Sequence, residues 1–181
     1  GLSRHNALQA LAARNVLPES RPAMRIAYIA PYQGPTLKRR RPIVVNLALA
    51  ANTKMELVTK LLRDAGHDVE VISQGEVVQR QYTFHPAMLE AEPFDSRIPV
   101  SYASALPIRF VNGFWSDFFT LRDFKARHRK QPFDTVVIYN MNTPQVTCAS
   151  HAIRRMGLPV FIHTGEPEAF WISALLARRA L

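Results

Sequence analysis

Short apolar runs that alternate with helical patterns constrain the fold of this chain more than any other feature does. Residues 25–30 form an apolar run that ends at Pro31, which is typical of a strand buried on both faces. A helical pattern begins near Met55, and Gly66 follows it where a carboxyl-terminal cap belongs. The next strand is predicted at residues 68–72, so this segment forms a βαβ unit whose right-handed crossover makes the two strands parallel neighbours.

The rest of the chain continues this alternation after a middle part, residues 76–114, that several prolines interrupt. The sequence predicts strands at 106–111, 134–139 and 159–163 and helices at 115–127, 144–156 and 166–180. Strands and helices that alternate in this way predict an α/β fold with a Rossmann-like, doubly wound parallel sheet.

The same pattern divides the chain into two segments. Residues 1–23 are predicted to form an N-terminal appendage with weak helical spacing, which Pro18 and Pro22 end. Met24 directly precedes the first strand, so the Rossmann-like domain is predicted to span residues 24–181.

Composition excludes several classes of protein. Hydrophobic residues make up 48% of the chain and charged residues 20%, which is enough apolar material for a core and excludes a disordered chain. No uninterrupted apolar run approaches the roughly 20 residues of a membrane span. The single cysteine, Cys148, excludes an intrachain disulfide framework and a multi-cysteine metal site. We therefore expect a cytoplasmic protein, with a peripheral place at the membrane left open, and neither a metal nor a cofactor.

The net charge of +9, from 23 Lys and Arg against 14 Asp and Glu, indicates an anionic neighbour. Charge alone does not distinguish a phosphorylated ligand, a nucleic acid and a membrane surface, and a solvated basic face is the alternative. The basic residues cluster at 38–41 and 122–130. No nucleic-acid-binding motif accompanies them, which argues against nucleic acid as the partner.

The residues that follow the predicted strands are the candidate site residues, because ligands of open parallel sheets bind beyond the carboxyl ends of the strands. They include Gly34, Asn140, Asn142, His163 and Glu166. His163 is the main catalytic candidate, since an imidazole can exchange a proton near neutral pH or bond a sugar hydroxyl. The alternative is that the glycine only forms a turn, that the two asparagines cap a helix and that the histidine is structural.

Two further residues have simpler explanations. Asn52 is predicted to cap the long helix, whose N-terminus is also a candidate anion site. Cys148 is predicted to be a small residue on a helix face, because neither a base nor an orienting partner can be placed beside it. The loop at Gly34 has no G-x-G-x-x-G pattern, and no Walker lysine pattern occurs.

Three segments carry a resemblance to a known family. MRIAYIAPYQGP and NLALAANTKMELVTKLLRDAGHDVEVISQGEV, at 24–35 and 46–77, resemble the opening of a family 4 glycosyltransferase. In that family a strand, a glycine-containing loop and a helix ending in Ala-Gly-His-Asp/Glu-Val lead into the second strand. FDTVVIYNMNTPQVTCASHAIRRMGLPVFIHTGEPEAFW, at 133–171, is similar to a later strand, helix and strand of the family and to its histidine loop.

The resemblance implies one half of a two-domain GT-B architecture, namely the N-terminal, acceptor-side domain of a retaining enzyme that uses a nucleotide sugar. It implies that His163 lies near the transferred sugar and that Gly34 lies close to the donor phosphates. Our hypothesis adds that Asn140 and Glu166 orient the acceptor. The chain departs from the family in two respects. Pro35 follows Gly34 where the family often has a second glycine, and no two glutamates have the E-x7-E spacing of the donor motif.

These departures lead us to expect that the donor-binding half is missing and that the chain alone is inactive. The implied partners are a nucleotide-sugar donor in that missing half and a carbohydrate or lipid-linked acceptor, which residues 38–41 could attract. Self-association or partner binding through Phe170, Trp171, Leu175 and Leu176 is a further expectation. The alternatives are a non-catalytic α/β binding module, or a partner subunit that completes a site with another chain, and a flavodoxin-like domain that holds a phosphorylated small molecule.

Overall fold

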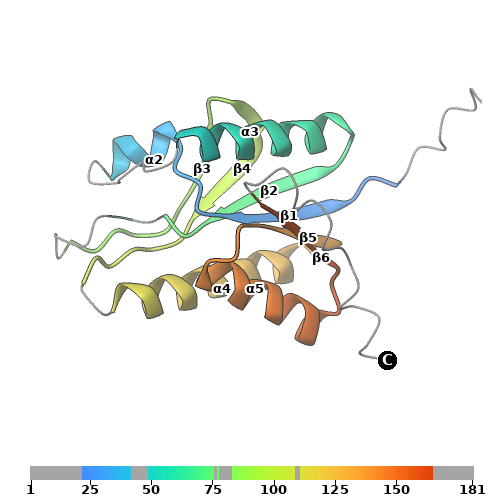
Figure 1. The fold of residues 1–181 in the computed structure, drawn as a ribbon. Coiled ribbons are helices and arrows are strands. Elements are labelled where there is room, and N and C mark those ends of the chain that lie inside the picture. Colours follow the sequence, from blue (N-terminus) through green and yellow to red (C-terminus); the bar gives the residue numbers. More distant parts are fainter. Residues whose placement is uncertain (1–21, 42–48, 76, 78–82, 109–110, 165–181) are drawn as a thin grey trace, which may run out of the picture.

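The computed structural model describes residues 22–41, 49–75, 77, 83–108 and 111–164, which form a three-layer α/β structure (Figure 1). A six-stranded sheet lies in the middle, α2 and α3 cover one face, and α4 and α5 cover the other. The strands are β1 (Arg25–Ala30), β2 (Asp68–Ser73), β3 (Met88–Glu92), β4 (Asp95–Tyr102), β5 (Thr135–Tyr139) and β6 (Val160–His163). The helices are α2 (Pro35–Arg40), α3 (Leu49–Asp64), α4 (Asn112–Lys130) and α5 (Thr143–His151), which continues as the π-helical turn η2 (Ala152–Met156).

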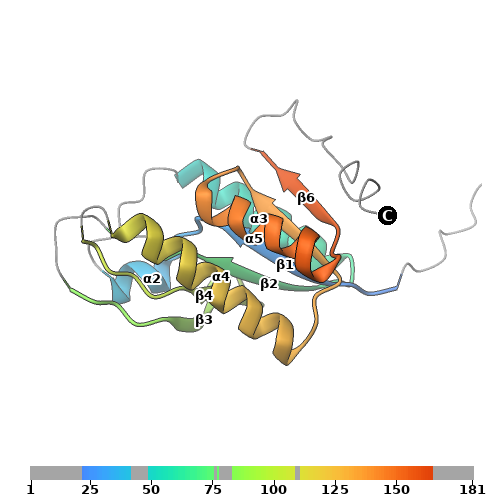
Figure 2. The same ribbon diagram turned by 90° about the horizontal axis from the view of Figure 1, so that it is seen from below.

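The sheet has the strand order β3-β4-β2-β1-β5-β6, and all its pairs are parallel except β3 with β4. The central strand β1 pairs with β2 on one side and with β5 on the other. The chain therefore winds away from β1 in both directions, which confirms the predicted Rossmann-like, doubly wound α/β fold. The two helices of the second face, α4 and α5, lie side by side in Figure 2.

The hydrophobic core lies on both faces of the sheet, because β1 is buried on both sides. Tyr28 packs in the cluster that includes Met55 of α3, whereas Ile29 packs in the cluster that includes Phe124 of α4. Cys148 of α5 is fully buried in this second cluster, and burial raises the pKa of its thiol to about 12. The prediction that Cys148 is a small structural residue is confirmed.

The predicted strand at 106–111 is wrong, because none of its described residues is in a strand. The parallel partner of β2 on its outer side is β4, which lies in the segment that the prolines interrupt. Pro99 lies just before the residues that pair with β2, which begin at Val100, so its missing N–H removes no hydrogen bond from that ladder. Ile108 instead accepts a hydrogen bond from the N–H of Val111 (3.1 Å) in the turn that leads into α4.

The other predicted elements agree with the structure to within a few residues, and a short helix, α2, lies in the loop after β1. Gly66 and Gly157 have φ values of +92° and +67°, which confirms that each ends a helix in the left-handed conformation. The helices predicted near the N-terminus and at 166–180 lie outside the described residues. None of the helices in the described ranges has the length and apolar content that crossing a bilayer requires.

Candidate functional site

A polar hollow with a volume of about 400 Å3 lies at the edge where β2, β4 and β5 end. Its wall consists of the loops after β2 and β4 and of the first turns of α4 and α5. We call it the strand-end pocket; its lining residues are Gln74, Ser104, Ala105, Asn112, Gly113, Ser116, Asp117, Asn142, Thr143 and Pro144. The pocket therefore stands where ligands of doubly wound folds bind.

Both α4 and α5 begin at the strand-end pocket. The N-cap residues are Val111 and Asn142, and neither makes a side-chain capping hydrogen bond. Neither helix has an acidic residue in its first turn. The first N–H groups of an α-helix have no acceptor within the helix, and the helix dipole makes this end positive. At α4 the N–H of Asn112 already donates to the carbonyl oxygen of Ile108 (2.9 Å), and Pro144 in the first turn of α5 has no N–H. The remaining N–H groups of these first turns can donate to oxygen atoms of a ligand.

Asp117 is the only ionisable side chain among the described lining residues of the strand-end pocket. It is half-buried, and burial raises the pKa of its carboxyl. The Ser104 hydroxyl accepts a hydrogen bond from Nε1 of Trp115 (3.3 Å). A carboxylate among hydroxyl and amide groups suits a ligand whose hydroxyls both donate and accept. Over the residues that the structure describes, no cluster of three or more His, Cys, Asp or Glu could hold a metal ion.

His163 lies at the end of β6, on the face of the sheet that α3 covers. Its side chain is 9% exposed, and its Nδ1 lies 2.7 Å from the hydroxyl of Tyr28. Its ring meets that of Tyr139 edge-on, with 5.0 Å between centroids. Burial, and secondarily the positive charge of Lys54, lowers the pKa of His163. The imidazole is therefore neutral at pH 7, and it is suited to hydrogen bonding rather than to holding a charge.

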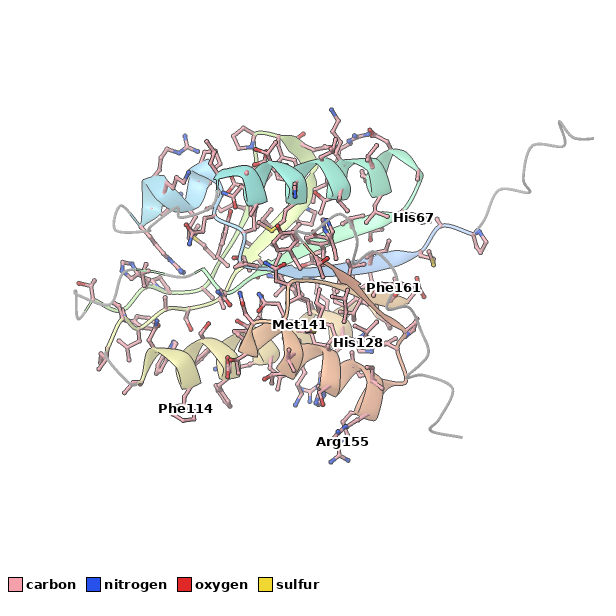
Figure 3. All side chains as sticks on the ribbon, in the orientation of Figure 1. His67, Phe114, His128, Met141, Arg155 and Phe161 are labelled. Carbon is pink, nitrogen blue, oxygen red and sulfur yellow. The ribbon has the colours of Figure 1, made fainter. Side chains whose placement is uncertain are left out.

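The structure brings His163 and Asn140 together but separates them from Asn142. The N–H of Asn140 donates to the carbonyl oxygen of His163 (2.9 Å), and Asn140 has a positive φ of 59°. Asn142 lines the strand-end pocket on the α4 and α5 side. Met141, labelled in Figure 3, lies between the two asparagines at this edge and is exposed. His163 thus lies on the α3 face of this sheet edge, whereas Asn142 lies on the face that α4 and α5 cover.

Gly34 lies against a buried carboxylate of the chain itself. A Cβ at this position would collide with the carboxylate of Glu92. The N–H of Gly34 donates to the hydroxyl of Tyr102 (3.2 Å), which donates to Glu92 (2.5 Å). The N–H of Thr36 in the first turn of α2 also donates to Glu92 (3.1 Å). Close packing against Glu92 therefore accounts for the glycine, and its implied contact with donor phosphates stays a prediction.

Asn52 does not cap the long helix, so that prediction is wrong. It lies inside α3, where its side chain is buried and binds the main chain of Gln33. Its Nδ2 donates to the carbonyl oxygen of Gln33 (2.7 Å), and its Oδ1 accepts from the N–H of the same residue (3.3 Å). The Asn52 amide thus binds the main chain of the loop after β1 instead of the first turn of the helix. Glu166 lies outside the described residues.

Arg41, the last residue of the first basic cluster, is buried rather than available to a ligand. Its side chain is 2% exposed and donates to the carbonyl oxygens of Gly75 (2.6 Å), Pro86 (2.7 Å) and Ala103 (3.0 Å). Burial lowers its pKa to about 10, so the guanidinium remains charged at pH 7. Gly75 and Ala103 each adjoin a lining residue of the strand-end pocket. Arg41 therefore fixes the two loops that form one side of this pocket.

Sequence reasoning missed Asp117, Ser104 and Ser116. These residues come from the end of the irregular middle part and from the helix after it, where the strand at 106–111 was misplaced. The signal that could have found them is Asn112-Gly113, a helix-initiating pair directly before the aromatic helical pattern.

Comparison of the chain with protein-family models, with curated protein sequences and with solved structures finds no match.

Proposed function

We propose that this chain is the acceptor-side domain of a retaining, nucleotide-sugar-dependent glycosyltransferase of GT-B architecture. The observation that carries the proposal is the strand-end pocket. It lies at the carboxyl edge of a Rossmann-like sheet, and its volume of about 400 Å3 is in the range of small-molecule sites. The same edge would face the donor-binding half, so an acceptor bound there would lie in the cleft between the two halves.

The lining of the pocket favours a neutral, hydroxyl-rich ligand such as a carbohydrate. Its described side chains are mostly amides and hydroxyls, with one carboxylate and no Lys, Arg or His. Amides and hydroxyls both donate and accept hydrogen bonds, as sugar hydroxyls do. A phosphorylated ligand would bind better beside a cationic side chain, which makes the flavodoxin-like alternative less suitable for this pocket.

In this proposal the chain positions the acceptor and the other half performs most of the chemistry. Asp117 accepts a hydrogen bond from the acceptor hydroxyl and orients it toward the anomeric carbon of the donor sugar. His163, on the α3 side of the edge, lies nearest the transferred sugar, and Asn140 adjoins it through a main-chain hydrogen bond. Stabilising the leaving nucleotide diphosphate requires donors from the donor-binding half. A location in the cytoplasm is part of this proposal.

Saccharide binding to the isolated chain tests the pocket. Saturation-transfer NMR with a panel of neutral mono- and disaccharides should detect binding to the wild type. Asp117→Asn should weaken it by about tenfold, because one charged hydrogen bond is lost. Asp64→Asn, which removes an exposed carboxylate at the end of α3, is the matched control and should leave binding unchanged. Equal binding by wild type and Asp117→Asn would refute the assignment of the pocket.

Sugar transfer separates the proposal from a non-catalytic binding module. The isolated chain should release no nucleotide diphosphate from any nucleotide sugar above a protein-free blank. Joined to a donor-binding half, it should transfer sugar to the saccharide that it binds, and Asp117→Asn should reduce this transfer. Saccharide binding without transfer in the joined protein would favour the binding module.

A further inference from the structure

The outer surface of α4 exposes two phenylalanines to solvent. Phe114 is 82% exposed and Phe118 is 60% exposed. Residues four positions apart lie on the same face of a helix, so the two rings project together. Figure 3 shows Phe114 at the first turn of α4, pointing away from the sheet. Large apolar side chains that gather on an exposed surface indicate an interaction site.

The second half of the same helix face is basic. Phe118, Arg122, Lys125 and Arg129 line one shallow surface hollow together with Leu121 and Ala126. In the part of the chain that the structure describes, none of these three basic residues forms a salt bridge. We call Phe114, Phe118, Leu121, Arg122, Lys125 and Arg129 the α4 outer face.

The acidic residues of α4 point elsewhere. Asp117 lines the strand-end pocket, and Asp123 binds Ser101 and Arg127. Arg127 also turns inward, where it pairs with Glu70. The guanidinium of Arg122 lies over the ring of Phe119, 5.6 Å from its centroid. The α4 outer face therefore combines exposed aromatic rings with positive charge that no described carboxylate neutralises.

We propose that the α4 outer face docks on the surface of an anionic lipid bilayer. Aromatic rings insert at the boundary between headgroups and acyl chains, and neighbouring Lys and Arg residues bind anionic headgroups. At about 1.5 Å per residue, the face extends for about 22 Å along the helix, which suits a helix lying in the plane of the membrane. The net charge of +9 adds long-range attraction to such a surface.

Docking in this way would place the strand-end pocket close to the headgroups. Phe114 directly follows Gly113, which lines the pocket, so the mouth of the pocket lies within about one helical turn of the inserted ring. The docking surface itself does not depend on the proposed function, because no residue of the α4 outer face lines the pocket.

Co-sedimentation of the full chain with lipid vesicles tests the proposal. We expect binding to vesicles that mix phosphatidylcholine with phosphatidylglycerol, and little binding to phosphatidylcholine alone. The triple variant Arg122→Gln, Lys125→Gln, Arg129→Gln should lower the partition coefficient by about a hundredfold, since each basic residue at an anionic surface contributes about fivefold. The double variant Phe114→Ser, Phe118→Ser should lower it by at least about tenfold.

Two matched controls carry the same chemical changes on the other face of the sheet. Lys38→Gln, Arg39→Gln, Arg40→Gln removes three charges from α2, and Leu57→Ser, Leu61→Ser removes an exposed apolar pair from α3, whose members are 57% and 59% exposed. Both controls should bind vesicles within about threefold of the wild type. Far-UV circular dichroism and thermal unfolding confirm that each variant is folded.

Three results would overturn the proposal. The first is no binding to anionic vesicles, and the second is an equal loss of binding in the control variants. The third is a dimer in sedimentation velocity that Phe114→Ser, Phe118→Ser dissociates, because the α4 outer face would then contact a second copy of the chain.

Discussion

Helices α2, α4 and α5 begin at the same edge of the sheet, but their N-termini differ. The carboxylate of Glu92 occupies the space beside α2, which we call the closed end, whereas the strand-end pocket lies beside α4 and α5, which we call the open end. At α2, the carboxylate of Glu92 binds the N–H of Thr36 and the hydroxyl of Tyr102 and fills the space beside Gly34. At α4 and α5, no N-cap side chain bonds the first turn, and the strand-end pocket lies there instead. The resemblance implies a ligand beside the Gly34 loop, whereas the space for a ligand lies at the N-termini of α4 and α5.

The difference has a simple physical origin. The side chains of β3 alternate in burial, and Glu92, at the end of the strand, is buried on the inner face. The N–H groups of Gly34 and Thr36 at that helix end are bonded by the chain itself, and the Glu92 carboxylate occupies the space beside them. At the open end, polar groups from separate loops converge but fill less than the available volume. A closed end stabilises the fold, whereas an open end can bind.

Arg41 links the two regions, and its loss should have the largest effect on stability. Arg41→Met leaves three carbonyl oxygens, two of them buried, without their shared donor, and we expect the free energy of unfolding to fall by about 3 kcal/mol. Urea denaturation followed by circular dichroism measures this change. Arg40→Met, at an exposed neighbouring position, is the control and should change the free energy by less than about 0.5 kcal/mol. Similar losses in the two variants would mean that Arg41 does not hold the loops.

Removing the Glu92 carboxylate from the closed end should have the next largest effect on the free energy of unfolding. Glu92→Ala removes the acceptor of two hydrogen bonds and leaves a cavity beneath α2, so we expect a loss of about 2 kcal/mol in the same assay. Glu90→Ala on the same strand removes only a part-exposed carboxylate, 3.7 Å from Arg40, and should cost less than about 0.5 kcal/mol. A Glu92→Ala variant as stable as Glu90→Ala would remove the distinction between a filled and an open helix end.

The sequence predicted the central strands well and the site only in part, for related reasons. The strands β1, β2, β5 and β6 are short apolar runs bounded by turn residues, so local pattern is sufficient to find them. The hairpin of β3 and β4 was missed because Pro93 and Pro99 interrupt this segment, although the pairing with β2 begins one residue after Pro99. Because the end of β4 was not predicted, Ser104 and Asp117, which follow it, were not recognised as candidates for the site.

Long-range contacts explain the remaining misses. The partner of Gly34 is Glu92, and that of Asn52 is the main chain of Gln33, and neither contact leaves a local signature. Asn142 was found because it lies in the short loop after β5, where the topology alone predicts a position at the ligand-binding edge.

Replacing Asp117, the carboxylate of the open end, should change the free energy of unfolding only slightly. The change should be a gain in stability, whereas Arg41→Met and Glu92→Ala lower it. Burial raises the pKa of Asp117, so the fold favours its protonated form, and ionisation lowers the stability as the pH rises above the unfolded pKa of about 3.8. Asp117→Asn should therefore match or slightly exceed the stability of the wild type at pH 7, by less than about 0.5 kcal/mol.

Asp95 provides a control of opposite sign for the Asp117 prediction. The guanidinium of Arg97 lowers the pKa of Asp95 to about 2, so its ionised form stabilises the fold. Asp95→Asn should be less stable than the wild type at pH 7, and the difference should shrink as the pH falls toward 2. If Asp117→Asn instead loses stability at pH 7 as Asp95→Asn does, then contacts within the chain stabilise the ionised Asp117. Asp117 would then be a structural residue like Glu92, and its carboxylate would not be available to a ligand.

The pH dependence of stability around His163 is the smallest expected effect and tests the α3 side of the edge. Burial and the charge of Lys54 lower the pKa of His163 in the folded state. The unfolded chain therefore binds the proton first, and stability should decrease as the pH falls below about 6.5, until the folded pKa is reached. One proton limits this slope to about 1.4 kcal/mol per pH unit.

His163→Gln should lose less stability than the wild type between pH 7 and pH 5, as measured by urea denaturation at both pH values. The lost hydrogen bond to Tyr28 lowers the stability of the variant by a similar amount at each pH, so it cancels when the slopes are compared. The pKa values of His85 and His151 are also lowered, but both residues are present in both proteins and cancel likewise. Equal slopes would show that the imidazole titrates alike in the folded and unfolded states. His163 would then lose its place as the neutral hydrogen-bonding group of this edge, and only the side that carries the strand-end pocket would remain a candidate site.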